Sequence, residues 1–342
     1  SVRAGGLSDA VRVAGGELPV LRYTAPQTFA TSGSMAEGGD RLELVSLPVT
    51  FDPTSGELSV ELSPSLAAAM LDGLEVLEHY RYECTEQTLS RFLPNLEAYR
   101  AVQEFGLDAP DLEARLERTL DDGLGRLLSQ QNLDGSWGWW AGGEGDDYLT
   151  AYVLYGLTRV RQAGISVPVS AIQRAVDYLN ASIPAPSQVT DGWRLDRLAF
   201  EYFALAQANG LNPSGPQQLS NRRDELAPWA QALLALTLES ISPGSAMSDT
   251  LLSDLQATAS RSATGVHWEA LQPGWQNMTS TLTNSAMVVY ALAQAAPAST
   301  LLPDAVNYLM AHRQADGAWG STYENAWVLM AMIEVMRGTG EL

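Results

Sequence analysis

The sequence contains no lysine, so all 20 of its basic residues are arginines. Against them stand 40 acidic residues, which give a formal net charge of −20. A chain this acidic cannot neutralise a phosphate backbone, which excludes nucleic acid as a partner, and it is disfavoured on anionic membranes. No apolar run approaches the roughly 18 residues that a direct membrane span requires.

Cysteine is almost absent as well, with one residue, Cys84, in the stretch YRYECTEQTLSRFLP (80–94). A single cysteine excludes an internal disulfide framework and a zinc site built from several thiolates. The hydrophobic content of 46% still indicates a well-cored folded protein. The opening SVRAGGLSDA lacks the features of a signal peptide, as expected of a mature or excised fragment, so it does not decide the compartment.

Residues 1–62 have the pattern of β structure. Apolar and polar residues alternate in three stretches, separated by glycine-rich turn compositions: ELPVLRY (17–23), RLELVSLPVTF (41–51) and ELSVELS (57–63). We expect three or four strands here, too few for a stable sheet on their own.

From residue 63 onward the apolar residues recur at helical spacing. Ser63 or Ser65 is a suitable cap for the first helix. The pattern predicts about twelve helices, near 65–79, 86–105, 111–131, 147–164, 169–181, 194–209, 215–221, 224–239, 247–260, 280–296, 302–314 and 322–337.

The links between helices contain a faint repeat. QQNLDGSWGWW (130–140) and HRQADGAWGSTY (312–323) each follow a helix, and TDGWR (190–194) and QPGWQN (272–277) resemble them more weakly. Such a turn places an aromatic ring against neighbouring helix ends. Repeated helical hairpins of this kind favour an α/α toroid, with about six inner and six outer helices, over a plain α-solenoid.

Cys84 and Gln87 lie three residues apart at the start of a predicted helix. Residues at the N-cap and N3 positions face each other there, about 5–6 Å apart between Cβ atoms. Attack of the thiol on the Gln87 amide carbon, with loss of ammonia, would give an intrachain thioester. The helix N-terminus should favour the thiolate, although the spacing alone also fits a buried, inert cysteine.

A thioester must be kept dry until it reacts. The sequence offers several aromatic side chains as candidates for shielding it, namely Tyr80, Tyr82, Trp137, Trp139, Trp140, Tyr148 and Tyr323.

The run YECTEQTLSRFLPNLEAYR resembles the thioester site of the α2-macroglobulin and complement superfamily, in which Cys, any residue, Glu and Gln are consecutive. Thr after the cysteine and Tyr-Glu before it are most similar to the bacterial α2-macroglobulins. The likeness extends over about residues 40–342, through the approach to the cysteine (52–84), DDYLTAYVLYGLTRVRQAG (146–164) and GAWGSTYENAWVLMAMIEV (317–335).

This resemblance implies an α/α-toroid thioester domain at 63–342, preceded by part of a CUB-type β domain at 1–62. Cys84 would be the sulfur donor and Gln87 the acyl donor, while the role of Glu86 in the motif stays open. The resemblance also implies a broad-spectrum protease trap, not an enzyme, in which the thioester acylates amines of attacking proteases. It implies no cofactor, contacts with other macroglobulin domains, and a periplasmic, extracellular or cell-surface location in a larger secreted or membrane-anchored protein.

Two other functions fit the helical pattern. One is an α/α-toroid enzyme, such as a terpene cyclase, polysaccharide lyase or cysteine-dependent hydrolase, with Cys84 paired to a histidine. The other is a non-catalytic helical scaffold. His79, His267 and His312 are each more typical of structural positions, and Asp146-Asp147 is more typical of a helix cap than of a metal site, so we expect no metal.

The absence of lysine has two explanations. GC-rich codon usage is the simpler one. The other is that an acyl donor in a lysine-free domain cannot cross-link to its own side-chain amines.

Overall fold

The computed structural model describes residues 2–9, 27–35, 38–52, 56–78, 83–104, 106, 110–270 and 274–340. In these ranges the chain forms the twelve predicted helices, within a few residues of the expected bounds. They are α1 (Leu66–Glu78), α2 (Thr85–Glu104), α3 (Pro110–Ser129), α4 (Asp147–Gln162), α5 (Val169–Ser182), α6 (Gly192–Gln207), α7 (Ser214–Ser220), α8 (Pro228–Ile241), α9 (Ala246–Ala257), α10 (Thr281–Ala295), α11 (Leu302–Ala311) and α12 (Thr322–Thr339).

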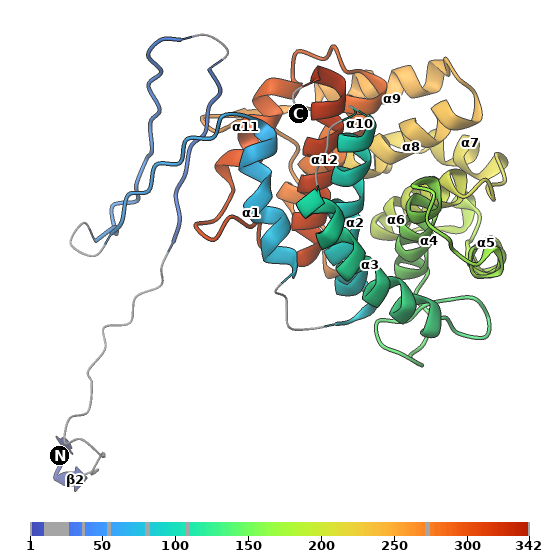
Figure 1. Ribbon diagram of the computed structural model, residues 1–342, viewed down its shortest axis with the longest axis horizontal. Coiled ribbons are helices and arrows are strands. Elements are labelled where there is room, and N and C mark those ends of the chain that lie inside the picture. The colour runs from blue at the N-terminus through green and yellow to red at the C-terminus, as the bar shows by residue number, and fades with distance from the viewer. Residues whose placement is uncertain are drawn as a thin grey trace.

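The even-numbered helices form a closed inner ring. Each packs against the next, from α2 through α4, α6, α8 and α10 to α12, and α12 packs back against α2. The odd-numbered helices lie outside, each against an inner neighbour (Figure 1). Because every outer helix returns the chain, the inner helices run the same way and begin at one end of the ring. This is the predicted α/α toroid with six inner and six outer helices.

Burial explains which helices are inside. Helix α12 buries thirteen of its eighteen residues and is apolar on all sides, as a helix surrounded by others must be. The outer helix α5 buries a single stripe instead, at Ala171, Ile172, Ala175, Val176 and Leu179. That spacing leaves its other face to solvent.

Aromatic side chains fill the axis of the ring. Tyr155 of α4 stacks on Trp327 of α12 with ring centroids 6.2 Å apart, and Phe200 of α6 meets the same indole edge-on. Helices α4 and α6 are not neighbours of α12 in the ring, so these contacts cross the axis. The column comprises Tyr148, Tyr152, Tyr155, Phe200, Phe203, Trp229, Tyr290, Tyr323 and Trp327.

The two strong tryptophan turns are built alike. The indole N–H of Trp137 donates to the Leu127 carbonyl at 2.7 Å, and that of Trp319 donates to Leu309 at 2.7 Å. In both turns a glycine two residues earlier has positive φ, 95° at Gly135 and 88° at Gly317, where a side chain would be strained.

The weaker matches do not form this turn. Trp193 and Trp275 are 40% and 85% exposed, so the prediction that they repeat the plug is wrong. The third buried copy is Trp268, whose indole donates to the Leu255 carbonyl at 2.7 Å.

The β predictions fare worse than the helices. Among the described residues, 41–51 and 57–63 form no strand, and 17–23 lies outside them. The alternating apolar side chains there are solvent-exposed, 83% at Leu42 and 86% at Leu58, because no second layer covers them. Figure 1 shows this segment extending beside the helical body.

Short hairpins occur outside the three stretches predicted as strands. Strand β1 (Val2–Ala4) pairs with β2 (Leu7–Asp9), and β3 (Ser260–Ser262) pairs with β4 (Gly265–His267), both antiparallel. The second hairpin lies within the region predicted to be wholly helical. In the described part of the chain, no helix combines the length and apolarity needed to cross a bilayer.

Candidate functional site

Cys84 is the N-cap of α2, as the capping pattern predicted. Its carbonyl accepts the Thr88 amide at 2.9 Å, and its own amide donates to Gln87 Oε1 at 3.3 Å. Gln87 therefore takes the N3 position and turns its side-chain carbonyl back toward Cys84. The two residues that the sequence singled out lie side by side across the first turn.

Cys84 is 7% exposed, and Gln87 is half-buried. Burial raises the pKa of the Cys84 thiol, and the nearby Glu86 carboxyl adds to the rise, while hydrogen bonds from the helix start oppose it. The hydrogen bonds of the helix start do favour the thiolate, but desolvation outweighs them, so the pKa of the thiol is raised overall. The thiol is protonated at neutral pH.

Thr85 anchors the first turn to the loop that follows α3. Its hydroxyl donates to the Gly138 carbonyl at 2.7 Å, and its amide donates to the Trp139 carbonyl at 3.1 Å. The Thr88 hydroxyl also donates to the Cys84 carbonyl, at 2.9 Å. The motif marks Thr85 only by its place after the cysteine, and no local pattern indicates its contacts, because the carbonyls that it binds are more than fifty positions along the chain.

Glu86 is buried, with 5% of its surface exposed. Its carboxyl accepts hydrogen bonds from Ser90 at 2.7 Å and from Thr322 of α12 at 2.9 Å. The Ser90 hydroxyl continues to Tyr152 at 3.0 Å. Burial raises the pKa of Glu86. Its carboxyl therefore joins the start of α2 to the start of α12, which is more than an ordinary first-turn acid does.

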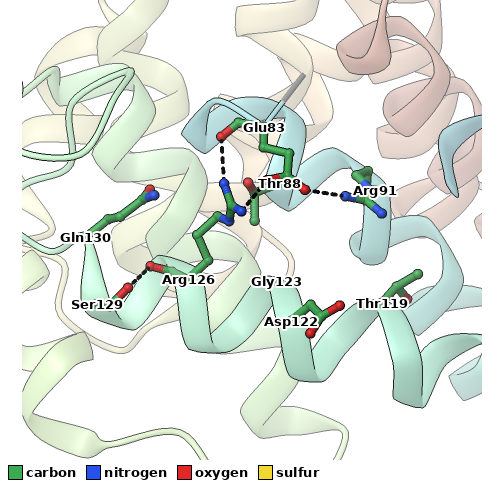
Figure 2. Close-up of a pocket in the computed structure, with 9 residues that line it drawn as sticks. All are labelled: Glu83, Thr88, Arg91, Thr119, Asp122, Gly123, Arg126, Ser129 and Gln130. Carbon is green, nitrogen blue, oxygen red and sulfur yellow. Dashed lines mark hydrogen bonds and ion pairs between the residues drawn. The ribbon is translucent and has the colours of Figure 1, made fainter. Parts of the chain in front are cut away.

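A groove runs between α2 and α3 beside the motif (Figure 2). Its volume is about 610 Å³, and Glu83, the residue before Cys84, reaches into it. Arg126 of α3 and Arg91 of α2 both pair with the Glu83 carboxylate. The lining is Glu83, Thr88, Arg91, Thr119, Asp122, Gly123, Arg126, Ser129 and Gln130.

A second cavity, of about 450 Å³, opens on the other side of the motif. Glu86 and Tyr323 meet the loop before α10 there, and the lining is Glu86, Gly274, Trp275, Met278, Thr279, Ser280, Ser321, Tyr323 and Glu324.

The candidate shielding residues occupy different environments. Tyr148 and Tyr323 belong to the aromatic column and share a hydrogen bond of 2.6 Å between their hydroxyls. Trp137 is fully buried in its turn, whereas Trp139 and Trp140 are 40% and 62% exposed. Trp139 contacts the motif through its main-chain carbonyl. Tyr80 and Tyr82 lie outside the described residues.

The two described histidines and the aspartate pair take structural positions. His267 bonds to Glu269 at 2.8 Å, His312 bonds to the Tyr308 carbonyl, and His79 lies outside the described residues. Asp146 caps α4 by accepting the Leu149 amide at 2.9 Å, as predicted. Among the residues that the structure describes, no three acidic, histidine or cysteine side chains are grouped for a metal ion.

Comparisons with known proteins match this arrangement. Residues 59–196 fit the family model of the A-macroglobulin TED domain. The alpha-2-macroglobulin of Thermotoga maritima is 35% identical over 173 residues, 51% of this chain and 10% of that protein. The alpha-2-macroglobulin of Escherichia coli is 31% identical over 163 residues, 46% of this chain and 10% of that protein.

Solved structures share the fold. Native E. coli alpha-2-macroglobulin aligns with a TM-score of 0.61 at 22% identity, over 78% of this chain and 17% of that one. Salmonella alpha-2-macroglobulin reacted with methylamine aligns with a TM-score of 0.60 at 23% identity, over 78% and 17%. The matched region spans about a tenth of the curated bacterial relatives. Residues 59–196, with the Cys-Thr-Glu-Gln motif at the start of an inner toroid helix, therefore match the A-macroglobulin TED domain, and the chain is similar in this region to the bacterial alpha-2-macroglobulins.

Proposed function

We propose that Cys84 and Gln87 form an intrachain thioester and that the chain transfers the Gln87 acyl group once, to an amine. The observation that carries this proposal is the hydrogen bond from the Cys84 amide to Gln87 Oε1 at 3.3 Å, which holds the amide group beside the cysteine. It brings the two residues together within a single helical turn, so the reaction loses little freedom of motion.

Both steps balance within the motif. Cys84 Sγ attacks Gln87 Cδ, a C–S bond forms, the C–N bond breaks, and the thiol proton leaves with the amide nitrogen as ammonia. Later an amine nitrogen attacks the same carbon, the C–S bond breaks, and a proton passes to the sulfur. In both steps negative charge develops on Gln87 Oε1, where the Cys84 amide already donates.

Burial of Cys84 suits a protected thioester, and the aromatic column argues against a toroid enzyme. The exposed fraction of 7% at Cys84 limits access of water to a thioester. The ring axis, where a toroid enzyme would hold substrate, is filled by rings such as Tyr155, Phe200 and Trp327. The Salmonella relative reacted with methylamine is similar over 78% of this chain.

In the intact protein we infer a role in protease inhibition. One E. coli relative of the same fold is described as trypsin-activated. The acyl group would then link target proteases through their amines. Residues 63–342 would form the thioester domain, and residues 1–62 would be part of a CUB-type β domain. Other macroglobulin domains would be its neighbours, in a periplasmic, extracellular or cell-surface protein.

Intact mass spectrometry and thiol titration test the proposal. The chain prepared without amines should have a mass one ammonia below the sequence value and no titratable thiol. Methylamine should add once and release one thiol. Gln87→Glu is the matched control, because it lacks the ammonia leaving group and should show the full sequence mass with a free thiol throughout. A wild-type chain with the full mass and a free thiol would overturn the proposal.

A further inference from the structure

Two glutamates flank the motif cysteine, and their charges lie in different surroundings. Glu83 comes directly before Cys84. In the groove between α2 and α3, Arg126 and Arg91 pair with its carboxylate (Figure 2). Its side chain is 44% exposed, so solvent screens its charge as well. Glu86 comes two residues after the cysteine and is only 5% exposed. Within the described part of the chain, no cation pairs with it.

The Glu86 carboxylate is held by hydroxyl groups in place of a cation. Ser90 donates to its Oε1 at 2.7 Å, and Thr322 donates to Oε1 at 2.9 Å and to Oε2 at 3.0 Å. The carboxylate lies where α2 and α12 both begin, and helix starts favour a negative charge. The hydroxyls satisfy its oxygens without cancelling that charge. Glu86 is therefore a buried anion in the same helical turn as Cys84.

The titratable groups around Glu86 do not neutralise it either. The hydroxyl of Tyr152 of α4 lies 3.0 Å from Ser90, one step further along the network. Tyr323 and Glu324 of α12 line the same cavity as Glu86, and none of the described residues that line it is basic. Burial raises the pKa of both tyrosines, so their hydroxyls stay protonated. Glu324 is an acid and cannot offset the charge.

We propose that the buried charge of Glu86 acts as a brake on the thioester, because it opposes the release of sulfur from Cys84. The proposal rests on the thioester chemistry above and gives the motif glutamate a role of its own. Glu86 need not touch the reacting atoms, since a charge acts at a distance and is weakly screened when it is buried. The groups that react remain Cys84 and Gln87.

The brake acts where the bond breaks. An amine nitrogen attacks Gln87 Cδ, a C–N bond forms, and the C–S bond breaks with its electron pair going to Cys84 Sγ. The sulfur carries negative charge until the amine proton reaches it. The Glu86 carboxylate opposes that charge, and the same repulsion contributes to the raised pKa of the Cys84 thiol. A thiol with a higher pKa is a poorer leaving group, so stray nucleophiles consume the bond more slowly.

The effect of the charge on the sulfur is tested without the thioester. In a Gln87→Ala background the thiol is free, and its rate of alkylation by iodoacetamide against pH gives the midpoint of its ionisation. Glu86→Gln should lower this midpoint by about one pH unit, because a like charge is removed. Glu83→Gln is the matched control and should lower it by less than about 0.3 units, because solvent screens that charge.

The form of the pH profile separates charge from packing. A loosened helix start would raise the alkylation rate at every pH, whereas removal of the charge moves the midpoint. Glu86→Leu repeats the comparison with an apolar side chain of similar size, which leaves no buried amide unpaired, and should give the same shift. Circular dichroism checks that each variant is folded.

The intact bond provides a second test. Among chains with the mass deficit of one ammonia, Glu86→Gln should incorporate methylamine about threefold faster than the wild type at the same pH, because its sulfur is the better leaving group. Glu83→Gln should react at the wild-type rate. Mass spectrometry and thiol titration follow both reactions.

A midpoint that stays in place in Glu86→Gln, or that shifts no further than in Glu83→Gln, would overturn the brake. So would a Glu86→Gln chain that forms the thioester and reacts no faster, or one that no longer forms it. A wild-type chain without the ammonia deficit would overturn the proposed function. The midpoints in the Gln87→Ala background do not depend on the bond, so the two failures are distinguishable.

Discussion

At the scale of single residues, Glu201 is the most unusual buried group. It lies in the middle of the inner helix α6 and is fully buried. Arg194 donates to its Oε1 at 2.7 Å, while Oε2 is without a partner in the described structure. Burial raises the pKa of Glu201 to about 8, and the charge of Arg194 only partly offsets this. The carboxyl is therefore largely protonated at neutral pH.

This shift predicts a pH-dependent stability. Because the folded-state pKa lies above the unfolded value, the folded protein binds the extra proton between them, and stability is lost as pH rises toward 8. The wild type should lose about 3–4 kcal/mol of its free energy of unfolding between about pH 5 and pH 8. Glu201→Gln, which mimics the protonated form, should not show this loss. Urea titrations of both proteins across this range measure it, and parallel pH profiles would contradict the assignment.

The sequence indicates the residues that we propose to react, but not their environment. Cys84 and Gln87 are recognisable because their pairing is local, within one turn of helix. The Thr322 hydroxyl that donates a hydrogen bond to Glu86 lies 236 positions along the chain. No pattern near the motif indicates this contact. The rise in the pKa of the Cys84 thiol could not be predicted for the same reason. The helix dipole is local and visible in sequence, whereas burial depends on the whole ring.

At the scale of elements, the tryptophan turns tie outer helices to the inner ring. The Trp319 indole N–H satisfies the Leu309 carbonyl in the last turn of α11 at 2.7 Å, and its amide donates to Asn325 Oδ1 of α12 at 2.9 Å. One residue thus joins the end of an outer helix to the start of the next inner one.

Trp319→Phe should therefore lower the free energy of unfolding by about 1–2 kcal/mol, because the buried Leu309 carbonyl loses its hydrogen bond from the indole and keeps only the longer one from the His312 amide, at 3.2 Å. Trp275→Phe is the matched control. Its side chain is 85% exposed, so the change should stay within about 0.5 kcal/mol. Urea unfolding followed by circular dichroism compares them, and equal effects would show that the buried hydrogen bond is not the cause.

Helices were predictable in this chain and strands were not. A helix satisfies its backbone internally, so the apolar period alone placed α4 and α12. The alternation at 41–51 and 57–63 indicates only that these segments could form strands against a neighbouring sheet. No such sheet covers Leu42 and Leu58 here, and both side chains are exposed. Trp193 and Trp275 failed as repeat positions because a Gly-Trp pair does not specify whether the ring is buried.

At the scale of the whole molecule, charge should bias which amines react. The net charge of −20 attracts basic proteins and repels acidic ones. Cys84 lies at the end of the ring where the inner helices begin. A large target must therefore approach that face. A small amine is different, because its reactive form is uncharged and gains nothing from the field.

We therefore expect salt to separate the two kinds of nucleophile. Conjugation to a lysine-rich basic protein should fall by about tenfold when NaCl is raised from about 0.02 to 0.2 M, as screening removes the long-range attraction. Methylamine incorporation at the same pH should change little. Gel-shift rates for the protein target and mass-spectrometric rates for methylamine provide the comparison. If salt slowed both equally, its effect would lie on the thioester itself, and the acidity of the domain would not select its targets.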